Sequence, residues 1–120
     1  MYGPHGSSHD GRPAVVNPGE LLVTVSGVGP EYEVRLFGEL DMATAPQLRD
    51  ELARLAANGA TRVTVDLGGL GFIDSTGLTV LISGLKRLRA QGGELALRGP
   101  TPGTRKVLEI TGLAEVFPIS

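Results

Sequence analysis

The apolar residues of this chain switch repeatedly between two spacings, and this pattern limits the possible folds more than any other feature. Within residues 31–37 apolar and charged side chains alternate, as in a half-buried strand, whereas residues 44–58 repeat leucine at the spacing of one helical face. Residues 61–67 return to alternation, and residues 78–88 return to the helical spacing. Alternating strands and helices are typical of α/β proteins whose strands run parallel.

The complete pattern predicts the order β-β-α-β-α-β-α-β in a single α/β domain. The first two β-prone runs flank a Gly-Val-Gly-Pro turn, so these strands should be antiparallel. Later strands should run parallel through right-handed crossovers, which gives a mixed β-sheet covered by α-helices. The expected strands are 21–26, 31–37, 61–67, 94–98 and 116–119, and the expected helices are 44–58, 75–91 and 102–111. The first helix should start with a capping box, because Thr44 precedes Pro46 and Gln47.

The length and charge of the chain limit its organisation and its partners. A chain of 120 residues fits one domain with a real core. Residues 1–19 are rich in Gly, Pro, Ser and His and are predicted to be a flexible N-terminal tail, with the domain at residues 20–120. A formal net charge of −2 provides no electrostatic footprint for a phosphate backbone, so we expect no direct binding of nucleic acid.

Compartment and membrane contact follow from what the sequence lacks. No apolar stretch is long enough to span a membrane, and the first residues contain no apolar core of a secretory signal. Without cysteine the chain has neither disulfides nor thiolate metal sites, which is compatible with a reducing cytoplasm. We therefore expect a cytoplasmic protein without membrane association.

Two predicted loops carry the side chains that most suggest a function. Residues 38–41 (Gly-Glu-Leu-Asp) follow the second strand, and residues 72–77 (Phe-Ile-Asp-Ser-Thr-Gly) follow the third. Loops at the carboxyl ends of neighbouring parallel strands meet at one edge of the sheet. We therefore expect Asp41 to face Ser75 across a short gap, with Ser75 at the positive end of the second helix.

Ser75 has two interpretations on these residues alone. A phosphate there would lie at a helix N-terminus, which favours anions, and would add roughly −1.5 to −2 charges beside Asp41 and Asp74. A docked partner would detect that change. The simpler interpretation is that Asp, Ser and Thr before a helix are only caps, each contributing about 1 kcal/mol. The spacing by itself favours the capping interpretation.

The groups expected of an enzyme or a metal centre are missing around Ser75. Ile73 replaces the first glycine of a Gly-x-Ser-x-Gly elbow, and the two histidines, His5 and His9, lie in the predicted tail. Two histidines alone leave a metal site incomplete. The run at residues 68–71 matches neither nucleotide-binding pattern and is interpreted as a flexible connection. We expect no catalytic residue, no metal and no cofactor.

A basic cluster occupies the end of the second predicted helix, at Lys86, Arg87 and Arg89. Such a cluster is most often the solvated face of a helix. The alternative is a rim that contacts an acidic partner.

Taken together, these motifs resemble those of STAS-domain proteins, in particular anti-sigma factor antagonists. The resemblance covers about residues 20–119 and includes residues 38–41, 72–77 and 92–95 (Gly-Gly-Glu-Leu). Residues 107–117 also resemble the helix-Gly-Leu ending of the family. The Asp-Ser-Thr-Gly sequence is the more specific part, and Gly-Glu-Leu-Asp alone is weak.

The resemblance implies a role in partner switching. The unmodified protein would bind an anti-sigma factor that is also a serine kinase and would free the sigma factor, and phosphorylation would end that binding. Ser75 matches the phosphoacceptor, Asp41 and Asp74 match its acidic neighbours, and Thr76 and Gly77 complete the motif. The nucleotide would belong to the kinase, and a serine phosphatase would reverse the modification.

Two other functions compete with this one. A non-switching STAS scaffold or transporter-accessory subunit would share the fold, with Ser75 as a helix cap only. An enzyme acting on a nucleotide or an ester would need a base near Asp41 and Asp74 that the sequence does not reveal. Family members commonly carry another helix after the last strand, whereas this chain stops at Ser120, so we expect exposed apolar surface that self-association or a partner would cover.

Overall fold

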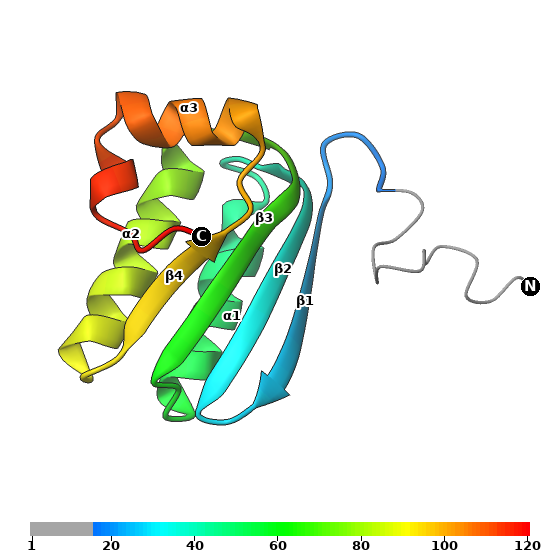
Figure 1. Cartoon of the computed structure of the whole chain (residues 1–120). Helices are drawn as coiled ribbons and strands as arrows, with labels where there is room; N and C mark the ends of the chain where they lie inside the picture. The colour runs from blue at the N-terminus through cyan, green and yellow to red at the C-terminus, as the bar shows by residue number, and fades with distance from the viewer. Residues whose placement is uncertain (1–15) are drawn as a thin grey trace, which may run out of the picture.

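Strands and helices alternate in the computed structural model, which describes residues 16–120 (Figure 1). The elements are β1 (Leu21–Val28), β2 (Glu31–Leu40), α1 (Ala45–Ala57), β3 (Arg62–Ile73), α2 (Ser75–Ala90), β4 (Glu94–Arg98), α3 (Pro102–Ile110) and the 3₁₀ helix η2 (Leu113–Glu115). The predicted α/β class is confirmed. Among the described residues, no helix is both long and apolar enough to cross a membrane.

The strands lie in the order β1-β2-β3-β4, which is their order in the chain. β1 is antiparallel to β2, with Leu21 opposite Gly38 and Val28 opposite Glu31. β2, β3 and β4 run parallel to one another, so α1 and α2 are the crossovers between them. The mixed sheet expected from the sequence is therefore present.

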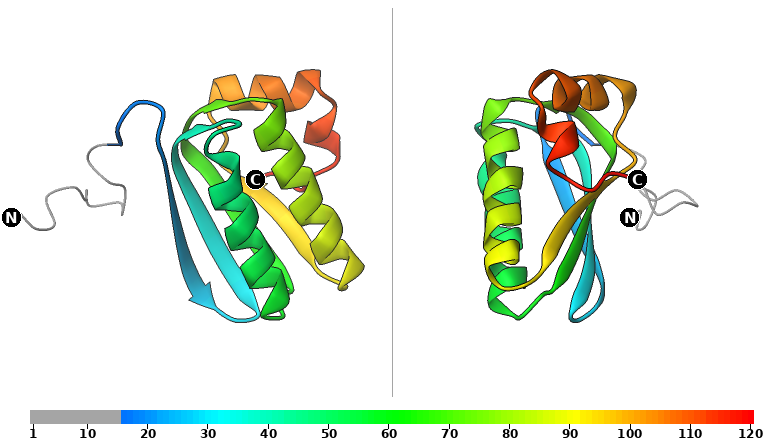
Figure 2. Two further views of the ribbon diagram at one scale, coloured as in Figure 1. Left: turned by 180° about the vertical axis from the view of Figure 1, so that it is seen from behind. Right: turned by 60° about the vertical axis from the view of Figure 1, so that its left-hand side comes forward.

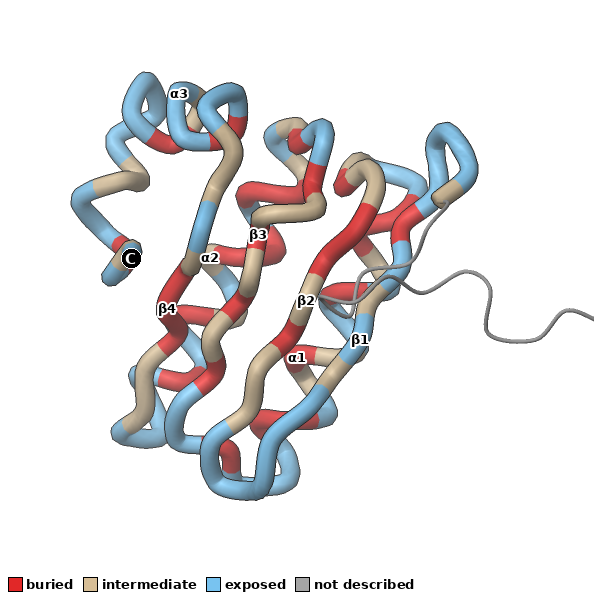
Figure 3. Tube along the Cα trace, turned by 45° about the vertical axis from the view of Figure 1, so that its right-hand side comes forward, coloured by how far each residue is buried: buried red, intermediate tan, exposed pale blue. Residues whose placement is uncertain are grey.

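The two long helices lie side by side on one face of the sheet, and α3 crosses the end where β3 finishes (Figure 2). Alternation in β2 sends Val34 and Leu36 into the core beneath the helices, where both are fully buried. Figure 3 shows the resulting change between buried and less buried residues along the central strands. The core therefore lies between the sheet and the layer of α1 and α2.

The opposite face of the sheet carries charged side chains instead of helices. Arg98 on β4 contacts Asp66 on β3 at 3.5 Å and also forms an ion pair with Glu33 on β2. Arg35 lies 4.0 Å from Asp66 and completes a network across three strands. These charges explain why this face needs no helix to cover it.

The central strands extend further than the sequence predicts, because they include both glycine-containing segments. The expected flexible connection at residues 68–71 is wrong, since these residues belong to β3 and pair with β2. A side chain on Gly69 would collide with the ring of Phe37, so the strands can pair here only because position 69 is glycine. The register shifts between Arg35 and Phe37 and again between Gly38 and Glu39, and at each shift the extra residue belongs to β3.

The predicted last strand, residues 116–119, is also wrong. Gly112, with φ of +78°, ends α3 and starts η2, and only Ile119 then forms a bridge, with Leu97 of β4. The Leu97 N–H donates to the carbonyl of Pro118 at 2.8 Å. This segment therefore follows the edge of β4 without forming a full strand.

The predicted N-terminal tail, residues 1–19, lies mostly outside the described residues. At residues 16–19 the chain is tied to the sheet, since the Gly19 N–H donates to the carboxylate of Glu39 at 3.1 Å. The Glu39 N–H in turn donates to the carbonyl of Glu20 at 2.9 Å. The start of β1 is thereby fixed beside the end of β2.

Candidate functional site

The candidate site lies where β2 and β3 end side by side. Leu40 pairs with Ile73 in the last position of the ladder, and the next residues are Asp41 and Asp74. The Asp74 N–H donates to the Leu40 carbonyl at 3.1 Å, which joins the two chain segments directly. The sequence-based expectation that Asp41 and Ser75 lie on neighbouring segments agrees with this geometry.

Asp41 organises the turn that leads into α1. Its Oδ1 accepts hydrogen bonds from the N–H groups of Ala43 at 3.0 Å and Thr44 at 3.1 Å. Its carbonyl accepts from the Ala45 N–H at 2.7 Å. The carboxylate is therefore held inside the turn that precedes α1.

The predicted capping box at Thr44 is wrong. The Thr44 side chain makes no capping bond to α1, because its hydroxyl donates to the Glu39 carbonyl at 2.8 Å and accepts from the Asp41 N–H at 2.9 Å. Gln47 donates instead to the Leu21 carbonyl on β1 at 3.1 Å. Thr44 thus closes the turn onto β2, and no side chain caps α1.

Asp74 caps α2, and Ser75 is the first residue of that helix. Asp74 has extended backbone angles, and its Oδ1 accepts from the Gly77 N–H at 3.0 Å. The interpretation of Ser75 as the helix cap is therefore wrong, since the preceding residue already has that role. The Ser75 side chain is exposed to solvent at the positive end of α2.

Gly77 lets α2 approach the sheet closely at this point. A Cβ at position 77 would lie 2.7 Å from Cγ of Leu40 and 3.0 Å from Cγ1 of Ile73. Leu40 is the last residue of β2, and Ile73 is the last residue of β3. Gly77 therefore fixes the height of the α2 N-terminus above the strand ends, and with it the position of Ser75.

Two apolar side chains flank the acidic residues. Met42, directly after Asp41, is 75% exposed, and Phe72, two residues before Asp74, is 49% exposed. The sequence patterns do not predict either as a site residue, although Met42 follows the first motif and Phe72 begins the second. Both therefore offer apolar surface next to the acidic turns.

The described part of this edge contains no cluster of metal-ligating side chains. Within residues 16–120, no group of three or more His, Asp or Glu side chains could hold a metal ion. The only histidines of the chain, His5 and His9, lie outside the described part. What the edge does present is the exposed Ser75, the carboxylates of Asp41 and Asp74, and the exposed side chains of Met42 and Phe72.

The sequence is similar to a known family model and to curated proteins. The family model described as Mlab, STAS domain, matches residues 23–118. BtrV of Bordetella bronchiseptica, provisionally named an anti-sigma factor antagonist, is 42% identical over 85 residues, which cover 71% of this chain and 73% of that protein. The anti-sigma-B factor antagonist of Staphylococcus aureus is 34% identical over 89 residues, which cover 74% of this chain and 82% of the relative.

Solved structures give the same result. The anti-sigma factor antagonist SpoIIAA in its unphosphorylated form is 27% identical with a TM-score of 0.73, and the match covers 82% of this chain and 88% of that chain. The phosphorylated form of SpoIIAA from Bacillus is 28% identical with a TM-score of 0.67, covering 82% and 91%. The chain therefore belongs to the STAS-domain family of anti-sigma factor antagonists.

Proposed function

We propose that the protein is an anti-sigma factor antagonist that binds its partner through the edge where β2 and β3 end. This docking edge consists of Asp41, Met42, Phe72, Ser75 and Thr76. The proposal rests first on the relatives, which are named anti-sigma factor antagonists. It rests also on the exposed side chains of Met42 and Phe72, which provide apolar surface that a bound partner would bury beside the acidic turns. Gly77 and Asp74 support the edge from below by positioning α2.

We propose further that phosphorylation of Ser75 ends this binding. The observation that carries the proposal is the exposed Ser75 hydroxyl at the first position of α2, next to a carboxylate that already serves as the cap. A phosphoserine there adds roughly −1.5 to −2 charges beside Asp74 and Asp41. At a desolvated interface such unpaired charge weakens binding, and each 1.4 kcal/mol corresponds to about a tenfold loss.

In this scheme the partner is an anti-sigma factor with serine kinase activity, which supplies the nucleotide. A serine phosphatase would restore the binding form. SpoIIAA, a structural relative, has been solved in unphosphorylated and phosphorylated forms, which supports a modification of this kind. We place the exchange in the cytoplasm and assign it to the STAS domain at residues 20–120.

The test is to measure binding of the full chain to the anti-sigma factor kinases encoded in the same genome. Ser75→Asp should bind at least tenfold more weakly than the wild type. Ser75→Ala should bind normally but should not be released when ATP is added. Ser26→Asp is the control, because Ser26 is exposed on β1, near the opposite end of the strands, and receives the same added charge.

Mass spectrometry should locate the phosphate on Ser75 after incubation with the kinase and ATP. Equal affinity of the wild type, Ser75→Ala and Ser75→Asp for the partner would reject the switch. The protein would then be better described as a non-switching scaffold on the same fold.

A further inference from the structure

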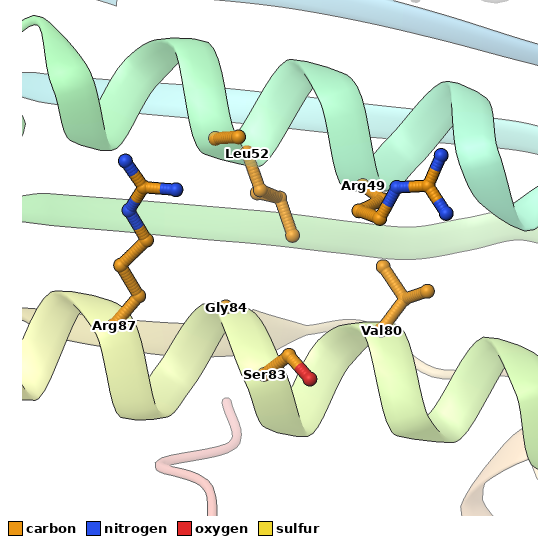
Figure 4. Close-up of a pocket in the computed structure, with 7 residues that line it drawn as sticks. Arg49, Leu52, Val80, Ser83, Gly84 and Arg87 are labelled. Atoms are coloured by element: carbon orange, nitrogen blue, oxygen red, sulfur yellow. The ribbon is translucent and has the colours of Figure 1, made fainter.

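A recessed surface lies between α1 and α2, on the side of these helices that faces away from the sheet (Figure 4). It is a hollow of about 90 Å³, and its floor consists of Leu52, Val80 and Gly84. Pockets for drug-sized ligands are larger, about 300–1,000 Å³. The hollow can therefore take an apolar side chain but not a cofactor.

The hollow exists because the two helices are in contact below it. Leu52 of α1 packs over Gly84 of α2, where a Cβ would lie only 2.9 Å from Cδ1 of the leucine. Leu52 and Val80 are largely buried, with 5% and 9% of their surface exposed. The floor of the hollow is consequently apolar, and packing between α1 and α2 fixes its shape.

A guanidinium group stands at each end of the hollow, since Arg49 and Arg87 line it from opposite ends (Figure 4). Arg49 contacts the neighbouring Asp50 at 3.4 Å, but both side chains are exposed, and such pairs contribute little. Among the described residues, Arg87 has no ion pair. Both guanidinium groups are therefore available to an acidic partner, although the whole chain carries a net charge of −2.

The spacing along α2 defines what would fit. Val80, Gly84 and Arg87 follow each other at i, i+4 and i+7, so they share one face over two turns, about 10 Å. A matching helix would present an apolar side chain to the hollow and one carboxylate near each end. Guanidinium and carboxylate groups then form charge-assisted, often bidentate hydrogen bonds.

We propose that this groove binds an acidic amphipathic helix of a partner protein. One aliphatic side chain enters above Leu52 and Val80, and two carboxylates about two turns apart meet Arg49 and Arg87. The groove is distinct from the docking edge, because none of its lining residues belongs to that edge. Its occupancy does not depend on Ser75 or on its modification.

Peptide titration of the full ¹⁵N-labelled chain tests the proposal. The probe is a synthetic helical peptide with glutamate at positions i and i+7 and leucine at i+4, and the matched peptide carries lysine in place of both glutamates. The acidic peptide should shift the amide signals of the groove, and the lysine peptide should not. No binding, equal binding of the two peptides, or shifts at the docking edge would overturn the proposal.

Charge reversal provides the matched variants. R49E/R87E should weaken binding of the acidic peptide at least tenfold, whereas R105E/K106E on α3, with the same change in net charge and exposed positions, should leave it within twofold. The amide spectrum shows whether the reversed charges disturb the fold. If they do, R49Q/R87Q replaces them, and it should also weaken binding of the acidic peptide. Equal weakening by the α3 variant would show a non-specific charge effect and would contradict the proposal.

Discussion

Asp74 and Ser75 are neighbours with different surroundings. The carboxylate of Asp74 is bound to the Gly77 N–H inside the turn, whereas Ser75, at the first helical position, is exposed to solvent. The first side chain therefore serves stability, and the second is free to serve recognition. The cap and the proposed phosphorylation site can be separated experimentally because they are adjacent residues.

Removal of the cap should cost more stability than removal of the hydroxyl. Asp74→Ala should lower the free energy of unfolding by about 1 kcal/mol, because the N–H of Gly77 loses its acceptor. Ser75→Ala should change it by less than about 0.5 kcal/mol, as expected for an exposed position. Urea denaturation of both variants measures the difference, and a larger loss for Ser75→Ala would contradict the assignment of the cap.

The motif residues themselves could be found from the sequence, but their local bonds could not. Asp41 and Ser75 were expected beside each other because parallel strands end at one edge. Thr44 was misassigned because the capping-box pattern ignores competing partners, and here the Glu39 carbonyl lies within 2.8 Å of the hydroxyl. Met42 and Phe72 were not identified because exposure of an apolar residue depends on how the neighbouring elements pack.

At the scale of elements, the contact between α2 and the strand ends is the tightest constraint on the site. Gly77→Ala should destabilise the protein by about 1–3 kcal/mol, because the added methyl group would overlap Leu40 and Ile73. It should also weaken partner binding by displacing Ser75.

Gly103→Ala is the matched control for that helix substitution. Gly103 lies near the start of α3, and a Cβ there meets nothing within 4 Å. Alanine should be neutral or stabilising by up to about 1 kcal/mol, since glycine is the poorer helix former. Thermal unfolding compares the two variants, and equal effects would show that crowding at Gly77 is not the cause.

The end of α2 is joined to β4 and to the C-terminal segment through Arg89. Its guanidinium donates to Glu94 at 2.9 Å and to the carbonyl of Val116 at 3.2 Å. The hydrogen bond from Arg89 holds the pKa of Glu94 below its ordinary value, against a smaller opposing effect of burial. The pair thus contributes stability above the ordinary carboxyl pKa and loses it as the pH falls through the lowered value.

Arg89→Gln should therefore destabilise the protein at neutral pH by less than about 1 kcal/mol, as is usual for exposed pairs. The difference from wild type should shrink in acid, once Glu94 is protonated in both proteins. Urea denaturation over a series of pH values measures this trend. Arg105→Gln, at an exposed position on α3, should show no such dependence, and a constant difference for Arg89→Gln would reject the ionic contribution.

Strand lengths were the weakest part of the fold prediction. The order of elements and the mixed sheet followed from the change between periods of two and 3.6 residues. β3 extends to Ile73 because glycines that usually interrupt a strand here make room for Phe37. That relation between two strands is a tertiary contact, so no local pattern could reveal it.

At the scale of the whole molecule, the sheet and the helices share one core. Leu81 of α2 is fully buried in it. Leu81→Ala should lower the free energy of unfolding by about 2–5 kcal/mol, because it removes buried methyl groups and leaves a cavity. Lys86→Ala, on the exposed face of the same helix, should stay within about 0.5 kcal/mol.

Within each protein, amide signals from α2 and from β3 should disappear at one urea concentration, which is lower for Leu81→Ala than for the wild type, since a single core unfolds cooperatively. Two separate transitions would indicate that the helices and the sheet are independent units.

Only Asp74 stands between the last residue of β3 and the first residue of α2. Because the connection is one residue long, the backbone at Ser75 cannot move away from the end of β3 to accommodate an added group. We expect modified and unmodified protein to share one backbone and to differ only in the charge that they show. The proposed switch would therefore change the surface charge at a fixed backbone position, and a partner would detect it without any rearrangement of the chain.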